Sequence, residues 1–222
     1  MVMLATAFVF ALKLPLFKNY FALIPALIIP AVFFSVIDGF FTRWSLCGLN
    51  SQYILGFYWL GLPLEQIAFY FSMPLASLVI YEAVAKLLPK DVMRLFTKAI
   101  TVFLLLLTIV LFFVFRKQLY TSVTMLLCAF LLSYRAWVAQ PKSLSRFYLS
   151  YLFVLIPVLM IYGILTSIGA LWYDPKQIIG LKLAAIPVEN MLYFFALFLM
   201  NVGIYDGFKH RKKQVLLEDN LS

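Results

Sequence analysis

Two glutamates stand at the same place in two similar apolar stretches of the chain. Glu65 follows Pro63 in GFYWLGLPLEQIAFYF, and Glu189 follows Pro187 in GLKLAAIPVENMLYFF. Proline suits the start of a helix, where its missing N–H leaves no hydrogen bond unmade. We therefore expect both glutamates in the first turn of a helix. There the helix dipole favours the ionised carboxylate and apolar surroundings favour the protonated acid, which suits a group that exchanges protons.

Aromatic residues follow each glutamate on the same helix face. Phe69 lies one turn after Glu65, and Tyr193 lies one turn after Glu189. Further candidates for a substrate-binding wall are Trp59, Tyr70 and Phe194. An acid above such a wall suits a long apolar substrate that becomes a carbocation, because each aromatic face stabilises a cation by about 0.5–2 kcal/mol.

A structural role for the two glutamates is the alternative. An acid in the first turn of a helix can be a capping residue in the headgroup region, and duplication alone would repeat it. Ionisable groups within membrane spans are, however, usually functional. Glu82 and Asp206 lie at the other ends of the same two segments, near Lys86 and Lys209, and we expect them in solvated ion pairs.

The elements that position these residues are membrane helices. Of the 222 residues 65% are apolar and 12% are charged, whereas soluble domains are roughly 45–50% apolar and about 25% charged. In such a chain, the net charge of +9 indicates basic cytoplasmic loops rather than nucleic-acid binding. The two cysteines, Cys47 and Cys128, are too few for a disulfide framework or a metal cluster, and we expect no metal site.

Seven apolar segments are long enough, or nearly so, to cross a bilayer. We expect spans near 1–16, 19–41, 62–85, 97–115, 119–137, 147–169 and 186–207. Thirteen Lys and Arg residues fall on one side of these spans and five on the other. This bias predicts the N-terminus outside and the C-terminus in the cytoplasm; we expect the membrane to be that of a bacterial cell.

The chain contains an internal repeat. The stretch from Gly56 aligns without a gap to the stretch from Gly180, 124 positions later, whereas the Leu-Ile-Pro at 23–25 aligns to 155–157 at a spacing of 132. The difference predicts an outer loop shorter by eight residues in the second half. We expect all-α architecture as a parallel 3+1+3 repeat. Its parts are residues 1–86 (first three-helix repeat), 87–117 (connector helix), 118–208 (second repeat) and 209–222 (basic cytoplasmic tail). The two glutamates would then face one central space.

With these motifs in hand, the chain resembles the integral-membrane lycopene cyclase domain family, whose members occur as paired small subunits or a fused chain. The resemblance rests on Asp38, on PLEQ at 63–66 and YE at 81–82, and on WY at 172–173, PVEN at 187–190 and YD at 205–206. It implies a carotenoid substrate such as lycopene. An acid would protonate the acyclic ψ-end, the chain would close on the cation, and a base would remove a proton to leave a β-ionone ring, without redox change.

The resemblance implies Glu65 and Glu189 as acid or base, with Asp38 nearby. The family pattern has two acids in tandem, whereas this chain has amides, Gln66 and Asn190, in the second places. An amide relays no proton and exerts no like-charge repulsion on its neighbour. The resemblance leaves open whether a reduced flavin or NAD(P)H acts as a non-redox helper.

Two alternatives remain at this point. A 3+1+3 parallel repeat is also the layout of SWEET-type sugar transporters, although polar residues here are confined to one end of the helices. A non-catalytic carotenoid-binding membrane protein would carry the same aromatic wall. No GxGxxG, HExxH or CxxC motif is present, and the sequence predicts membrane lipid, not nucleic acid, as the other partner. The oligomeric state is not predicted.

Overall fold

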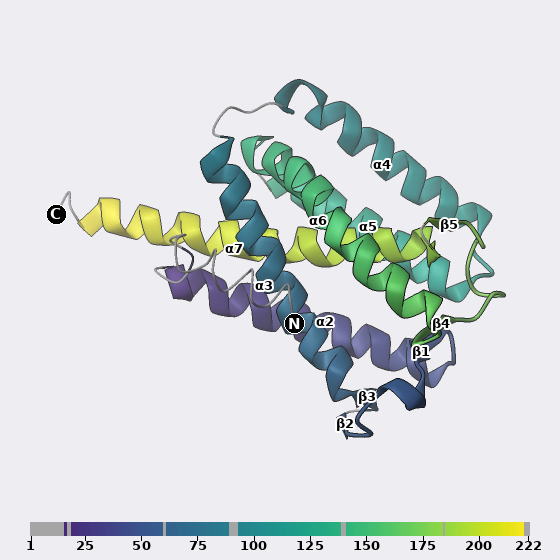
Figure 1. The fold of residues 1–222 in the computed structure, drawn as a ribbon. Coiled ribbons are helices and arrows are strands. Elements are labelled where there is room, and N and C mark those ends of the chain that lie inside the picture. Colours follow the sequence, from purple (N-terminus) through teal and green to yellow (C-terminus); the bar gives the residue numbers. More distant parts are fainter. Residues whose placement is uncertain are drawn as a thin grey trace.

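The computed structural model describes residues 16, 19–59, 61–88, 93–138, 141–183 and 185–219. Within these ranges the chain is all-α apart from short strands in the connections (Figure 1). The long helices are α2 (Tyr20–Arg43), α3 (Leu64–Leu87), α4 (Arg94–Val114), α5 (Leu119–Val138), α6 (Pro141–Ser167) and α7 (Val188–Asp219).

All six helices are long and apolar enough to cross a membrane, so the chain is an integral membrane protein. Six of the seven expected spans are thereby confirmed. The first, 1–16, lies outside the described residues apart from Leu16. Helix α6 begins six residues before its expected start, and α7 continues through the expected tail boundary to Asp219. Lys and Arg do not interrupt a helix, because its backbone hydrogen bonds are internal and long cationic side chains can reach the interface.

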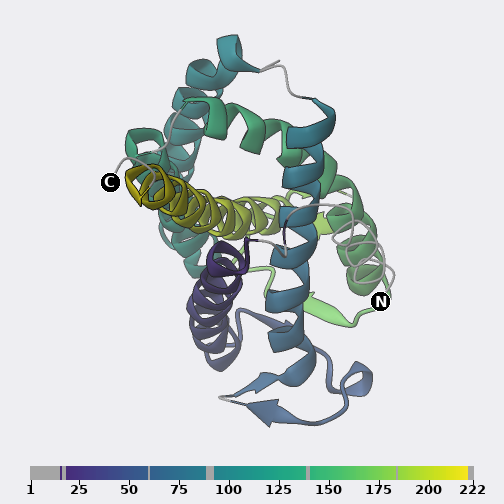
Figure 2. The ribbon, with the colours of Figure 1, turned by 90° about the vertical axis from the view of Figure 1, so that its left-hand side faces the viewer.

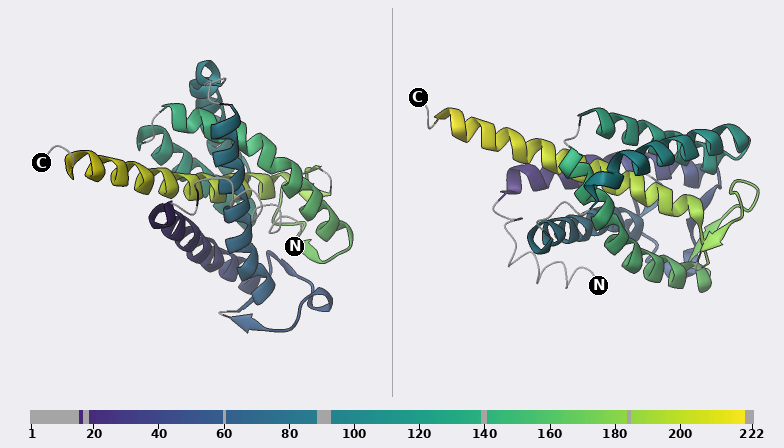
Figure 3. Two further views of the ribbon diagram at one scale, coloured as in Figure 1. Left: turned by 60° about the vertical axis from the view of Figure 1, so that its left-hand side comes forward. Right: turned by 90° about the horizontal axis from the view of Figure 1, so that it is seen from above.

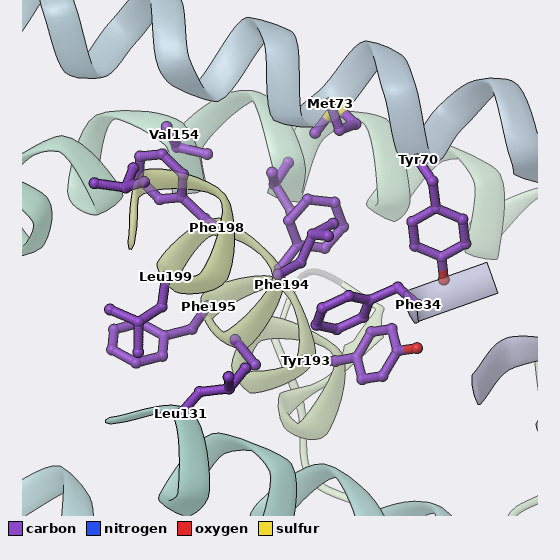
Figure 4. Packing of buried hydrophobic residues seen from close by; sticks show 14 of the residues in the cluster. Phe34, Tyr70, Met73, Leu131, Val154, Tyr193, Phe194, Phe195, Phe198 and Leu199 are labelled. Atoms are coloured by element: carbon purple, nitrogen blue, oxygen red, sulfur yellow. The ribbon is translucent and has the colours of Figure 1, made fainter. Parts of the chain in front are cut away.

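Helix α7 is the centre of the bundle and packs against α2, α3, α5 and α6 (Figure 2). Its middle carries buried aromatic side chains, among them Phe195 and Phe198 (Figure 4). The rings of both contact that of Phe147 on α6. Helix α4 lies outside, against α5 and α6, and buries three threonines. One of these, Thr101, hydrogen-bonds Tyr148 of α6 over 2.6 Å. The apolar outer faces of α4 and α6 are consistent with contact with lipid.

Short strands gather at one end of the bundle, which we call the strand end (Figure 1). β1 (Cys47–Leu49) pairs antiparallel with β4 (Leu171–Tyr173) and so joins the two halves of the chain. β2 (Tyr58–Trp59) with β3 (Leu62–Pro63), and β5 (Lys182–Leu183) with β6 (Ile186–Pro187), form hairpins directly before α3 and α7. These strands have no recognisable sequence pattern, since each is only two or three residues long.

The connections after α2 and α6 carry the same hydrogen bonds 124 positions apart. The amide of Leu46 donates to the carbonyl of Phe41, and that of Ala170 donates to Leu165. The two hairpins match at this spacing as well. The connection from α2 to α3 and the connection from α6 to α7 are therefore equally long. The two Leu-Ile-Pro stretches, 132 positions apart, are therefore not equivalent positions of the repeat. The predicted shortening of the loop by eight residues in the second half is wrong.

The opposite end of the bundle holds ion pairs whose carboxylates are buried, whereas solvated pairs were expected. Glu82 is buried and pairs with Lys209. Asp206 pairs with Arg135 at 3.6 Å and also accepts a hydrogen bond from Tyr81. The prediction failed because Glu82 and Asp206 lie on helix faces that pack inside the bundle. Beyond this end α7 projects past the other helices (Figure 3).

Candidate active site

A cavity of about 370 Å³ lies at the strand end, enclosed by α2, α3, α5, α6 and α7 and by the β1–β4 pair. Its deep wall is formed by the buried tyrosines Tyr70, Tyr120 and Tyr193. At its rim, Tyr53 and Ile168 are each about half exposed, and the Tyr53 hydroxyl donates to the Ile168 carbonyl over 3.0 Å. The lining is mostly apolar and aromatic with few polar groups, as is usual for sites that bind small organic molecules.

Asp38 of α2 is the most heavily hydrogen-bonded side chain in the cavity wall. It is 7% exposed. Its Oδ1 accepts from the Tyr193 hydroxyl at 2.7 Å, and its Oδ2 accepts from Gln66 Nε2 and from the Tyr70 hydroxyl. The ring of Phe34 lies between the two tyrosines (Figure 4). Two helices, α3 and α7, thus bring donors to one carboxyl group of α2 inside an aromatic core.

Glu65 lies in the first turn of α3, as expected, and lines the same cavity. Its Oε1 accepts a hydrogen bond from the Leu55 amide at 2.6 Å. Its Oε2 is buried and has no hydrogen-bond partner among the described residues. One oxygen therefore holds the preceding loop, and the other is available for a substrate.

Glu189 lies in the first turn of α7 and makes the corresponding loop contact, accepting from the Ile179 amide. It also accepts from the Thr121 hydroxyl of α5 at 2.8 Å. Its side chain is 0% exposed and is not among the residues that line the cavity. The structure thus differs from the expectation that both glutamates face a common space, because α5 packs over Glu189.

The residues next to the glutamates occupy well-defined places. Pro63 and Pro187 end the hairpin strands β3 and β6, directly before α3 and α7 begin. Pro63 is therefore the residue that caps α3 rather than its first helical residue. Asn190 lines the cavity, where its Oδ1 accepts from the Tyr120 hydroxyl at 3.3 Å. Of the two amides, only Gln66 donates a hydrogen bond to Asp38.

The five predicted wall residues separate into three positions. Phe69, Tyr70 and Tyr193 line the cavity. Phe194 packs one layer behind them, with its ring 5.6 Å from that of Phe69. Trp59 is 60% exposed and lies on a groove between the outer faces of α2 and α3, away from the cavity. Its strand β2 turns outward, so sequence proximity to Glu65 was misleading.

Comparison with known proteins decides the family. The sequence model for lycopene cyclase matches residues 1–84 and 117–208, which is most of the chain. The chain belongs to the lycopene cyclase family. Membership implies a carotenoid cyclase function. No curated protein and no solved structure gave a match.

The matched segments of this lycopene cyclase family member contribute every residue that lines the cavity, and α4, which lies wholly between the two segments, contributes none. Sequence reasoning missed several lining residues, including Cys47, Tyr120, Tyr162 and Tyr173. Burial raises the pKa of the Cys47 thiol well above its ordinary value, and the nearby Asp38 carboxylate adds to the effect. Burial likewise raises the pKa of the Tyr173 phenol. Of these four residues, only Tyr173 belongs to a motif of the family pattern, the Trp-Tyr at 172–173. The pairing of β4 with β1 places it in the cavity wall.

Proposed function

We propose that the protein cyclises the acyclic end group of a carotenoid, lycopene or a close relative, to a β-ionone ring. The observation that carries this proposal is an aromatic cavity inside a membrane protein that presents two carboxyl groups, Asp38 and Glu65. A redox-neutral cyclisation needs one acid and one base, and it needs water kept away from the carbocation. The aromatic walls meet the second need and stabilise the cation.

The size of the cavity fits one end of such a substrate. Sites for small organic molecules have roughly 300–1,000 Å³, and this cavity, at about 370 Å³, is near the lower limit. A long polyene would insert one end group and leave the remainder outside. The exposed rim side chain Ile168 follows α6, whose outer face carries further exposed apolar residues such as Ile164. The free part of the polyene would therefore lie along α6 in the lipid.

The sequence predicts Glu65 and Glu189 as acid and base, and the geometry supports the two unequally. Each glutamate has one buried oxygen without a hydrogen-bond partner among the described residues, but only Glu65 lines the cavity, so we propose Glu65 as the acid that protonates the terminal double bond. Glu189 holds Ile179 and Thr121 behind the wall. It would serve the reaction by positioning the loop that contains Ile179. No step requires a flavin or NAD(P)H to exchange electrons, and a helper role for either stays open.

We also propose the parallel 3+1+3 repeat, with the domain boundaries after residues 86, 117 and 208. Support comes from the hairpins before α3 and α7, the connections after α2 and α6 and the two glutamate–loop contacts, all of which recur 124 positions apart. In the β1–β4 pair, Gly48 stands opposite Trp172, its own counterpart at this spacing. The cavity combines counterparts from both halves, such as Gln66 with Asn190. A pseudo-twofold axis would thus pass close to the site.

The charge distribution supports an orientation with the C-terminus in the cytoplasm, which puts the strand end and the cavity at the outer side of a bacterial cell membrane. Reporter fusions at 88–93 and 115–118 would test this orientation. An active cytoplasmic reporter at the second site, together with an inactive one at the first, would reverse it.

Expression in a lycopene-accumulating bacterial host tests the cyclase function. Cyclised carotenoid in the pigment extract is the expected result, and Glu65→Gln should abolish it while membrane levels of the protein stay normal. Unchanged lycopene with wild-type protein in the membrane would contradict the proposal. If lycopene then co-purified unchanged with the protein, a carotenoid-binding role would replace the enzymatic one.

A further inference from the structure

We infer that Asp38 is the base of the cyclisation and the anionic partner of the carbocation, and that Gln66 holds it in this role. The inference rests on the proposed cyclase function and assigns its second half-reaction to a residue. It derives from the three side chains that meet the Asp38 carboxyl group and from its place in the cavity wall.

The hydrogen-bond pattern at Asp38 is that of an acceptor on both oxygens. Oδ1 accepts from Tyr193, and Oδ2 accepts from Gln66 and Tyr70. The amide nitrogen of Gln66 has only protons to give. Donors that converge on a carboxylate stabilise its charge. Burial alone disfavours that charge, whereas the three donors and the positive charge that develops in the reaction favour it.

Glu65 has the complementary pattern. Its Oε1 accepts one backbone hydrogen bond, and its Oε2 meets no donor among the described residues. This arrangement leaves one carboxyl oxygen of Glu65 in the cavity wall free to approach a double bond of the substrate. The two carboxyl groups therefore differ in environment, which is how a site separates an acid from a base.

The proton balance closes without a further reactant. The Glu65 proton adds to the terminal double bond, and the neighbouring double bond then closes the ring by forming one C–C bond. The resulting ring cation loses a proton to Asp38, which creates the ring double bond. Transfer of one proton from Asp38 back to Glu65 restores the site, and no electrons leave or enter the substrate.

Gln66 fixes Asp38 as the proton acceptor and Glu65 as the proton donor. A carboxyl group at position 66 would share a proton with Asp38, since two adjacent carboxyl groups do not readily ionise together. The amide removes that option and leaves Asp38 as acceptor. Asn190 has no such effect, because its hydrogen bond is to Tyr120 rather than to Asp38.

The test compares Asp38→Asn with Glu65→Gln in membranes containing lycopene in D2O, with products and recovered lycopene analysed by chromatography and mass spectrometry. In Asp38→Asn we expect at least a 100-fold loss of β-rings. The substrate should still be protonated, so the recovered lycopene should carry deuterium at its ends or the extract should contain hydrated or isomeric end groups. In Glu65→Gln the lycopene should be recovered unlabelled and unaltered.

Two results would overturn the inference. One is that Asp38→Asn forms β-rings at more than a tenth of the wild-type rate. The other is that, with an active wild type, lycopene recovered from Asp38→Asn is unlabelled and unaltered. An inactive wild type would instead remove the proposed function itself. Glu82→Gln, a buried carboxyl variant at the opposite end of the bundle, should leave the product pattern unchanged. Gln66→Glu serves as a second variant should Asp38→Asn not accumulate. It should alter the pH dependence of ring formation, and an unaltered pH profile would count against the role of Gln66.

Discussion

The hydroxyl of Tyr193 on α7 donates a 2.7 Å hydrogen bond to Oδ1 of Asp38 on α2, across 155 positions of sequence. Both side chains are buried in the cavity wall. Because no other donor reaches Oδ1 among the described residues, Tyr193 alone orients this half of the carboxyl group. The bond joins the last helix of the chain to the first one described and is part of both the fold and the site.

Tyr193→Phe tests this bond with little change in packing. A hydrogen bond to a charged group contributes about 1.5–3 kcal/mol, so we expect ring formation to slow by about 10- to 100-fold. The protein should remain folded in the membrane. The readout is the initial rate of cyclisation at equal protein level.

Tyr148→Phe is the matched control, since it also removes one buried hydroxyl bond, to Thr101, but outside the cavity. It should leave the rate within about twofold, because no group that lines the cavity changes. Equal losses in the two variants would show that the Tyr193 effect is one of general stability.

Glu189 should behave as a positioning residue. In Glu189→Gln the side-chain oxygen can still accept from Ile179 and Thr121, so we expect most of the activity and stability to remain. In Glu189→Ala both hydrogen bonds are lost from a buried site, and unfolding in detergent should become easier by about 1–3 kcal/mol. Cyclisation rates and thermal unfolding of both variants provide the measurement. A stable but inactive Glu189→Gln would restore Glu189 to the chemistry, as the sequence alone suggested.

The two hairpin turns offer a paired test of backbone strain. Gly61 turns the first hairpin with φ 81°, and Ala185 turns the second with φ 68°. A left-handed conformation costs a residue with a Cβ about 1–2 kcal/mol. Glycine avoids this cost but loses more conformational entropy on folding, which destabilises the folded state by about 0.5–1 kcal/mol. Gly61→Ala should therefore lower, and Ala185→Gly should raise, the free energy of unfolding by about 0.5–1 kcal/mol. Shifts of the same sign in the two variants would contradict this account.

Cys47 should react slowly with thiol reagents. Burial and the negative charge of Asp38 disfavour the thiolate, so the raised pKa keeps the thiol protonated at neutral pH. In a Cys128→Ala background the alkylation rate should rise about tenfold per pH unit from pH 7 to 9 without a plateau. Asp38→Asn should increase the rate at each pH. A plateau near the ordinary thiol pKa of about 8.5 would exclude the raised value.

The membrane character, six helix positions and the family were within reach of the sequence. Long apolar runs specify spanning helices almost alone, since backbone hydrogen bonds in lipid must be satisfied within the segment. The placement of Glu65 in a first helical turn followed from Pro63 for the same local reason. The family followed from the order and spacing of motifs such as PLEQ and PVEN, which can be read along the chain without knowing how the helices pack.

What only the tertiary structure decided is which of these residues meet. Helix periodicity places Glu189 on a face but does not say that α5 covers that face, and nothing local to Asp38 indicates that donors from α3 and α7 converge on it. Trp59, beside Glu65 in sequence, turns outward, while Tyr162 and Tyr173 come from the other half of the chain to complete the wall. Sequence patterns specify what each helix is. The packing of the helices against one another, which depends on contacts between distant segments, specifies the site.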